Sequence, residues 1–238
     1  MAIKHINLDN KSFAINYEIA NNSSKNTIVF LHGWGSNKEV MKSSFSSFLP
    51  ELKHIYIDMP GFGKSDNEYV LTTQDYANII KEFLKNEESI VAIAGHSFGG
   101  KVATLLNPKN LILLSSAGII EEKSDKVKFK IKLAKVLNSF GLGSLTKAFR
   151  SKDVNTMSES MYSTFKNVVD EDFTNSFKDF KNNALIFWGE TDSATSLESG
   201  IKISSLIQDS KFYSYNGDHY FFMKYANDIT TKIKDGIL

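Results

Sequence analysis

Residues 90–106 read IVAIAGHSFGGKVATLL, and this stretch decides the fold. An apolar run at 90–94 is followed at once by the pentapeptide GHSFG at 95–99, and a segment with helical spacing comes next. The pentapeptide fits G-x-S-x-G, which presents a serine hydroxyl on a tight, strained turn between a strand and a helix. Its glycines leave room for the helix to pass close to the strand. We therefore predict that Ser97 is a nucleophile at the end of a buried strand.

Apolar runs of the same kind recur along the chain and predict a parallel sheet. Short, nearly continuous apolar segments are typical of strands buried on both faces. Besides 90–94, they lie at 27–31, 55–57, 111–114 and 184–188, with a further strand at 211–215. Segments with helical spacing lie between them, at 40–49, 73–84, 97–106, from 197 and from about 219. This alternation predicts an α/β fold with right-handed crossovers and helices on both faces of the sheet.

Two segments depart from this alternation. Residues 3–8 and 12–19 alternate apolar and polar side chains and predict an antiparallel hairpin with one exposed face. Residues 119–181 are rich in lysine, contain no buried-strand run and have a helical stripe that includes Phe129. We interpret 119–181 as a helical cap inserted into one core domain, which comprises 1–118 and 182–238.

Composition sets broad limits on function. The chain has 238 residues, 42% of them hydrophobic and 23% charged, which indicates a globular domain. A net charge of +1 gives no overall positive electrostatic field that would attract nucleic acid. The absence of cysteine excludes disulfides and cysteine-bound zinc, and it fits a reducing cytoplasm. No signal-peptide pattern and no apolar stretch of about 18 residues occurs, so we expect no membrane span.

A second glycine-rich turn, HGWG at 32–35, closes the strand at 27–31. In a serine-nucleophile site the negatively charged oxygen is held by two main-chain N–H groups, one after the nucleophile and one from the loop after such a strand. We expect the N–H groups of Phe98 and Trp34 to form this oxyanion hole, and Gly33 to lie against the substrate. The indole of Trp34 can also be a packed aromatic, which is compatible with that role.

Ser97 needs a base, because a hydroxyl is a weak nucleophile at neutral pH. Four of the five histidines are expected to be structural or exposed: His5, His32, His54 and His96. His219 remains, since it follows the strand at 211–215 on a loop that can swing an imidazole toward the serine turn. We predict His219 as the general base, with a simple helix cap as the alternative.

The imidazole in turn needs a carboxylate to hold its tautomer. Asp192 follows the buried strand at 184–188 and gives the chain order Ser, Asp, His. Glu190 and Asp218 are local rivals, and Glu121 or Glu122 could serve in a variant geometry.

The sequence does not match the motifs of nucleotide-binding or metal-binding sites. GFGKS at 61–65 ends like a phosphate-binding loop, but Asp58 stands where that loop requires its first glycine. No glycine-rich dinucleotide fingerprint opens the first helix, and no paired-histidine spacing indicates a metal. We therefore expect no cofactor and no metal.

The chain resembles the α/β-hydrolase superfamily across nearly its whole length. Four landmarks occur in order: LHGWG at 31–35, DMPGFGKS at 58–65, GHSFGG at 95–100 and WGETD at 188–192, followed by His219. The resemblance implies an eight-stranded, mostly parallel sheet with a helical cap after the sixth strand. It also implies a serine hydrolase that acts through an acyl-enzyme.

Within the superfamily, the stretches at 32–40 and 58–63 are similar to esterases that act on a methyl ester borne by acyl carrier protein. The lysine-rich cap would suit such an acidic carrier, although a lysine run is more often a solvated face. The chain departs from those esterases at His96 and Phe98. Candidate substrate contacts are Gly33, Phe62, Phe129, Tyr162 and Phe165. Thioester cleavage, carbon–carbon bond hydrolysis and a non-catalytic binding module remain alternatives.

Overall fold

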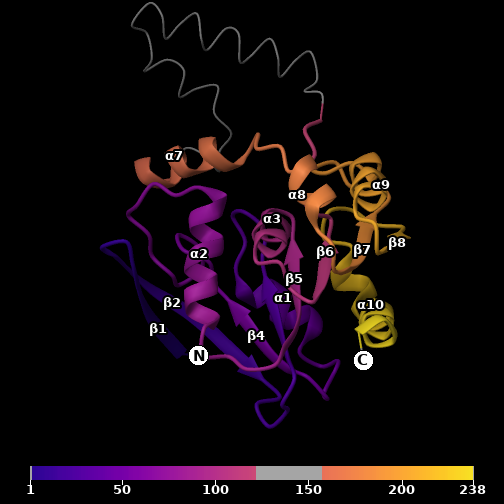
Figure 1. Ribbon diagram of the computed structural model, residues 1–238, viewed down its shortest axis with the longest axis horizontal. Helices are drawn as coiled ribbons and strands as arrows, with labels where there is room; N and C mark the ends of the chain where they lie inside the picture. The colour runs from indigo at the N-terminus through magenta and orange to yellow at the C-terminus, as the bar shows by residue number, and fades with distance from the viewer. Residues whose placement is uncertain (1, 122–156, 238) are drawn as a thin grey trace, which may run out of the picture.

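The computed structural model describes residues 2–121 and 157–237. Its centre is one eight-stranded sheet in the order β1-β2-β4-β3-β5-β6-β7-β8 (Figure 1). The strands are β1 Ala2–Leu8, β2 Lys11–Ala20, β3 Thr27–Leu31, β4 Lys53–Ile57, β5 Ile90–His96, β6 Asn110–Leu114, β7 Asn183–Gly189 and β8 Ser210–Tyr215. The pairs β1–β2 and β2–β4 are antiparallel, and the remaining neighbours are parallel. The predicted mostly parallel sheet with an antiparallel hairpin at its edge is confirmed.

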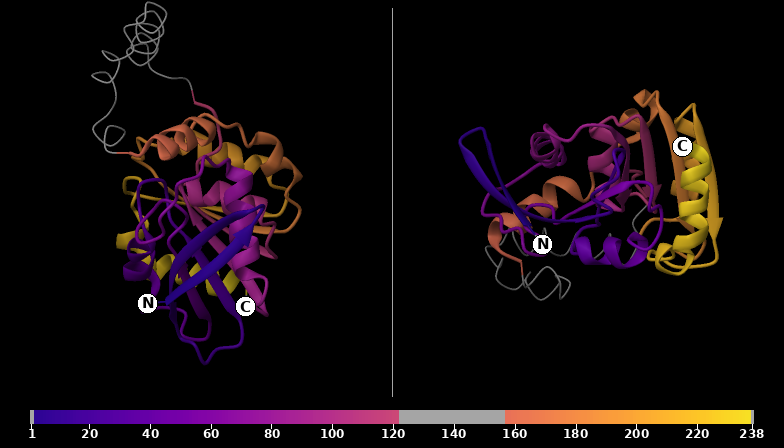
Figure 2. Two further views of the ribbon diagram at one scale, coloured as in Figure 1. Left: turned by 90° about the vertical axis from the view of Figure 1, so that its left-hand side faces the viewer. Right: turned by 90° about the horizontal axis from the view of Figure 1, so that it is seen from below.

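Helices cover both faces of the sheet, as the two views of Figure 2 make visible. They are α1 Lys38–Phe45, α2 Thr73–Leu84, α3 Phe98–Leu105, α7 Glu159–Val168, α8 Thr174–Asp179, α9 Leu197–Leu206 and α10 Phe222–Ile237. One apolar core includes side chains of α2, α3, α8 and α9, and the other includes those of α1 and α10. Alternate residues of β3 enter the two cores, which is why this strand is a continuous apolar run.

Two helices begin at residues other than those that the sequence predicts, and each start has a local cause. Helix α1 begins at Lys38 because the Asn37 side chain accepts the N–H of Glu39, and it ends at Phe45. Helix α10 begins at Phe222 rather than at about residue 219. The Asp218 carboxylate accepts the N–H of Tyr220 at 2.8 Å, so residues 218–221 form a turn instead.

The inserted segment is described only at its two ends, and Phe129 lies outside the described residues. Helix α7 lies across the end of the molecule at which β5 ends, in orange in Figure 1. The Thr164 hydroxyl accepts the N–H of Leu71 at 3.0 Å, and the Asn167 amide donates to the Leu71 carbonyl at 3.2 Å. These bonds fasten α7 to the loop before α2.

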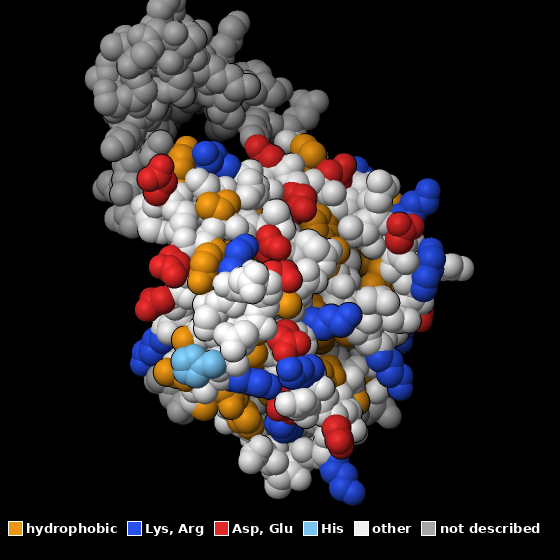
Figure 3. Space-filling model, turned by 60° about the vertical axis from the view of Figure 1, so that its left-hand side comes forward, with side chains coloured by type: hydrophobic (Ala, Val, Ile, Leu, Met, Phe, Trp, Pro, Cys, Tyr) orange, Lys and Arg blue, Asp and Glu red, His pale blue; other side chains and the backbone are white. Residues whose placement is uncertain are grey.

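Surface charge is mixed on the face in Figure 3, where acidic, basic and apolar side chains alternate. Over the whole sequence the charges nearly cancel, to a net charge of +1. Within residues 2–121 and 157–237, no helix is long and apolar enough to cross a bilayer.

Candidate active site

Ser97 lies on a strained turn between β5 and α3. Its φ of 51° and ψ of −115° fall outside the backbone conformations that non-glycine residues prefer. The Ser97 N–H donates to the carbonyl of Leu114 at the end of β6, and its own carbonyl accepts the N–H of Ala117. Its side chain does not cap α3. The backbone is thus held by the neighbouring strand, while the hydroxyl is not used to start the helix.

Gly95 and Gly99 make this turn possible. A Cβ on Gly95 would lie 2.3 Å from the carbonyl oxygen of Gly99, and one on Gly99 would lie 2.5 Å from that of Leu31. Both obstacles are backbone atoms, which cannot rotate away. Helix α3 can therefore pass over β5 and β3 only if both positions lack a side chain.

We expect Gly95→Ala to destabilise the protein by about 3 kcal/mol, because the added methyl forces α3 off the sheet. Thermal and denaturant unfolding measure the loss. Gly35→Ala is the control. Residue 35 has a φ of 71° but nothing within 4 Å of an added Cβ, so only the backbone cost of about 1 kcal/mol remains. Equal losses in the two variants would contradict the close-packing argument.

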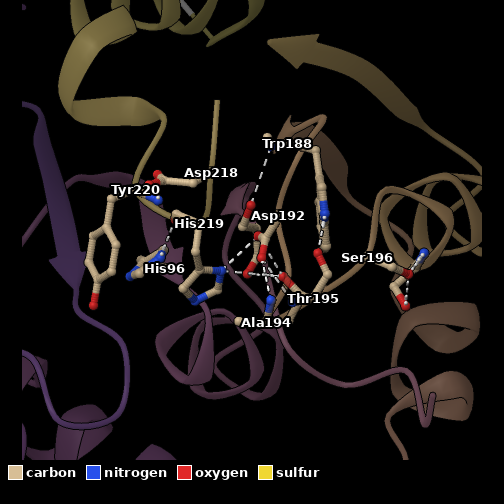
Figure 4. Close-up of polar contacts among 12 residues, drawn as sticks. His96, Trp188, Asp192, Ala194, Thr195, Ser196, Asp218, His219 and Tyr220 are labelled. Carbon is tan, nitrogen blue, oxygen red and sulfur yellow. Dashed lines mark hydrogen bonds and ion pairs between the residues drawn. The ribbon is translucent and has the colours of Figure 1, made fainter. Parts of the chain in front are cut away.

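The loops after β7 and β8 bring Asp192 and His219 into contact (Figure 4). The His219 Nδ1 atom lies 2.7 Å from Asp192 Oδ2, and the Asp192 side chain is fully buried. The other carboxylate oxygen, Oδ1, accepts the N–H groups of Ala194 at 2.8 Å and Thr195 at 3.0 Å. The Thr195 hydroxyl lies 3.0 Å from Oδ2. Asp192 is therefore a fixed acceptor with its orientation set by its own loop.

Burial alone would raise the pKa of Asp192, but hydrogen bonds from His219 and from the Thr195 N–H lower it to about 2. The carboxylate is thus ionised at neutral pH and accepts the Nδ1–H of His219. This fixes the tautomer of the neutral ring, with the proton on Nδ1, so that Nε2 is the nitrogen that can accept a proton. A proton acceptor is available on the side of the imidazole that faces away from Asp192.

His219 is also joined to the serine turn through His96, the residue directly before Ser97. The His96 Nε2 atom lies 3.0 Å from the main-chain oxygen of His219, and the two ring centres are 4.6 Å apart. Tyr220 packs against both rings, as Figure 4 shows. The structure therefore brings Asp192 and His219 together and bonds the His219 main chain to the residue next to Ser97. Within residues 2–121 and 157–237, no hydrogen bond joins the Ser97 side chain to His219 or to Asp192.

The rival carboxylates have other partners. Glu190 accepts the Ser214 hydroxyl, and Glu121 accepts the Ser196 N–H and the Ser199 hydroxyl. Asp218 holds the turn before α10. Glu122 lies outside the described residues. Among the described carboxylates considered, Asp192 is the one bonded to His219.

The glycine-rich loop after β3 lies against the serine turn. A Cβ on Gly33 would stand 3.1 Å from that of Ser97, and the Trp34 ring meets the Phe98 ring edge-on at 5.5 Å. His32 braces this loop: its Nδ1 donates to the Gly33 carbonyl, and its Nε2 accepts the N–H of Met59 at 3.1 Å. Burial lowers the pKa of His32 to about 4, so the ring stays neutral and keeps both bonds.

The GFGKS segment at 61–65 packs around the carboxylate of Asp58. Asp58 pairs with the buried Lys38 at 2.8 Å and accepts the main-chain N–H of Lys64 at 3.0 Å. A Cβ on Gly63 would strike the same carboxylate at 2.3 Å. The loop therefore holds the Asp58 carboxylate in the turn after β4. Gly63 is needed there because a side chain would collide with that carboxylate.

A cavity of about 1050 Å³ adjoins the site. Its lining includes Phe62, Trp34 and Tyr220. Trp34 also packs on Phe98, the residue after Ser97, and Tyr220 packs on His219. Of the other predicted contacts, Phe165 packs on Trp34 at 5.4 Å, and Gly33 packs on Ser97 and His96. Neither these two nor Tyr162 is among the described lining residues.

Sequence reasoning missed two neighbours of the site. The surroundings of Thr195 were detectable, because an aspartate side chain at a turn commonly bonds the backbone two residues on, which here is Ala194, the neighbour of Thr195. Tyr220 carries no such signal, because its contact with His96 joins residues from distant parts of the chain. No group of metal-ligating side chains occurs in residues 2–121 and 157–237.

A model of the Alpha/beta hydrolase family matches residues 28–190, more than half of the chain. The chain belongs to this family. The resemblance and fold class predicted from the sequence are thereby confirmed, and the chain is placed among hydrolases.

Curated proteins and solved structures are also similar to this chain. The chain is 34% identical over 90 residues to a pimeloyl-[acyl-carrier protein] methyl ester esterase of Proteus mirabilis, covering 37% of this chain and 34% of the relative. A Wigglesworthia glossinidia brevipalpis protein of the same name is 28% identical over 79% of this chain and 69% of its own. A thermophilic esterase from Thermogutta terrifontis superposes with a TM-score of 0.73 at 16% identity, over 99% and 97% of the two chains, which shows the shared fold. The matches span at most about a third of the first three curated relatives.

Proposed function

We propose that this chain is a serine hydrolase that cleaves carboxylic esters or thioesters by a Ser97–His219–Asp192 triad. The observation that carries the proposal is the 2.7 Å hydrogen bond between His219 and the buried Asp192 side chain, joined through His96 to the strained turn that presents Ser97. A binding module would not need a tautomer-fixing carboxylate behind an imidazole.

The mechanism has two steps. The Ser97 Oγ attacks the ester carbonyl carbon while Nε2 of His219 takes the hydroxyl proton, and the resulting tetrahedral intermediate collapses when that proton passes to the leaving alcohol. Water then attacks the acyl-enzyme, with His219 as base and then as acid, and the carboxylic acid leaves. Asp192 remains ionised and stabilises the imidazolium in both steps.

The oxyanion would be held by the N–H groups of Phe98 and Trp34. Phe98 is the first residue of α3, where N–H groups have no partner within the helix and the helix dipole favours negative charge. Trp34 lies on the loop that packs against Ser97 through Gly33. Removing one such donor typically costs about 10² to 10³ in kcat.

We further propose that 119–181 form a cap over the site and that the protein works in the cytoplasm. Support for the cap comes from α7, which is bonded to the core at Leu71 and carries Phe165 against Trp34. Support for the compartment is the absence of cysteine. From the names of its relatives, the substrate to test first is a methyl ester carried by acyl carrier protein.

Purified protein would be tested against short- and long-chain esters, thioesters, acyl-carrier-protein esters and a vinylogous diketone, with fluorophosphonate labelling in parallel. Ester turnover together with labelling is the expected result. Turnover of the diketone alone would favour carbon–carbon hydrolysis. Absence of both turnover and labelling in the folded protein would favour a binding module and overturn the proposal.

The cavity beside the site leads to a prediction about substrate charge. Asp66 and Glu68 are the only charged residues in its described lining. Because a cleft focuses the field of its walls, a negative substrate group would be repelled. We expect a neutral ester to be hydrolysed with a kcat/KM about ten times that of an ester of equal length with a terminal carboxylate.

The matched test is the double variant Asp66→Asn/Glu68→Gln, which keeps side-chain size and removes both charges. The preference should fall about threefold or more at low salt and less at high salt. Glu88→Gln, an exposed carboxylate before β5 at the other end of the sheet, serves as the control and should leave the ratio unchanged. A wild-type preference for the anionic ester would contradict this prediction.

A further inference from the structure

His96 stands where three parts of the site meet. It ends β5 directly before Ser97, its ring packs against the ring of His219 at 4.6 Å, and its Nδ1 would lie 3.0 Å from a Cβ on Gly33. The residue is 1% exposed. One buried side chain thus contacts the loop that carries the base and the loop after β3.

The hydrogen bond of His96 has a fixed direction. Its partner is the main-chain oxygen of His219, which can only accept, so Nε2 of His96 carries the proton. Nδ1 is then an acceptor, and it is buried with no partner among the described residues. Burial, with the neighbouring His219 next in importance, lowers the pKa of His96 to about 3. The ring therefore stays neutral at neutral pH, and its Nε2–H remains a donor.

The loop that carries His219 needs such a support. Residues 218–221 form a turn between β8 and α10, in which Asp218 accepts the N–H groups of Tyr220 and Phe221. The bond to Asp192 fixes the ring of His219 at Nδ1. Main-chain bonds hold the loop on both sides of His219, from the Thr191 N–H to Gly217 and from the Phe221 N–H to Asp218, but neither involves the main chain of His219 itself. His96 provides the anchor to β5, the strand that also carries Ser97.

We propose that His96 is a positioning residue: its Nε2–H holds the main-chain carbonyl of His219 and so fixes the imidazole relative to Ser97. This inference rests on the proposed function. It assigns a role in catalysis to a residue that the sequence pattern indicates only as structural. Misplacement of a catalytic group by about 1 Å can cost about 10² in rate, so loss of the anchor should lower kcat with little change in KM.

The test compares two amides that differ in reach. His96→Gln presents an amide N–H as many bonds from Cα as Nε2 of histidine, whereas the amide of His96→Asn is one carbon shorter and cannot reach the His219 carbonyl. We expect kcat to fall about ten- to a hundredfold in His96→Asn and to stay within about threefold of wild type in His96→Gln, with KM nearly constant in both. Equal kcat values for the two variants would overturn the proposal.

His54→Asn is the control for loss of a buried histidine. His54 is fully buried and bonds Tyr56 and Leu49, far along the chain from the catalytic loops. This variant should lose stability as His96→Asn does and keep its kcat. A kcat loss equal to that of His96→Asn would indicate a general effect of destabilisation and overturn the positioning role.

A second readout does not depend on turnover. The proton shared by His219 Nδ1 and Asp192 gives a characteristic low-field NMR resonance, which should move or broaden in His96→Asn and persist in His96→Gln. An unchanged resonance in His96→Asn would overturn the proposal even if the enzyme is active. Conversely, a wild-type protein that neither turns over esters nor reacts with fluorophosphonate disproves the proposed function, while this spectrum still decides whether His96 positions His219.

Discussion

Ser97→Ala lowers kcat/KM for the best ester by about 10⁵-fold or more and abolishes fluorophosphonate labelling. The expected loss is large because the Ser97 oxygen forms the covalent bond, and a triad without its nucleophile retains only binding and oxyanion stabilisation. The variant should still fold, since the Ser97 hydroxyl does not cap α3 and alanine keeps the Cβ that packs on Gly33. Single-turnover and labelling assays on the folded variant measure the effect.

The matched control is Ser43→Ala, an exposed serine of α1 whose hydroxyl bonds the Val40 carbonyl. Its turnover and labelling should equal those of the wild type. Full activity in Ser97→Ala would mean that another group is the nucleophile, and the proposed acyl-enzyme mechanism would be wrong.

Asp192→Asn should lower kcat by about 10⁴-fold while leaving the fold intact. The loop explains why this isosteric change is so severe. The N–H groups of Ala194 and Thr195 both point at Oδ1, so the asparagine carbonyl takes that place and its NH₂ group faces Nδ1 of His219. An amide that donates to Nδ1 selects the tautomer protonated at Nε2, which cannot accept the proton of Ser97.

Steady-state kinetics of Asp192→Asn and of a control variant, Glu190→Gln, test this prediction. Glu190→Gln removes the neighbouring carboxylate, whose described partner is the Ser214 hydroxyl, and it should change kcat by no more than about twofold. If Glu190→Gln lost activity and Asp192→Asn kept it, the assignment of the orienting carboxylate would be reversed.

Much of the fold could be predicted from local pattern. The run at 27–31 is apolar because β3 is covered on both faces, and the alternation at 3–8 marks an edge strand paired to one neighbour. The GHSFG pentapeptide predicted the strained serine because a strand, a turn with φ above zero and a helix within so few residues require glycines on both sides. These properties depend on neighbours in the chain, so the sequence displays them directly.

The bounds of α10 could not be predicted in the same way. The helical spacing extends back toward His219, but the carboxylate of Asp218 bonds the N–H of Tyr220 and stops the helix at Phe222. A local side chain competed with the helix for a backbone donor, and periodicity does not weigh that competition.

The sequence by itself determined the parallel α/β fold, the serine turn and the order of Ser97, Asp192 and His219. Only the tertiary structure decided that Asp192, rather than Glu190 or Asp218, bonds His219, and that His96 holds the His219 main chain. The physical reason is the origin of each contact. Strand and turn patterns arise from residues a few positions apart, whereas these bonds join the ends of β5, β7 and β8, whose meeting depends on the register of the whole sheet.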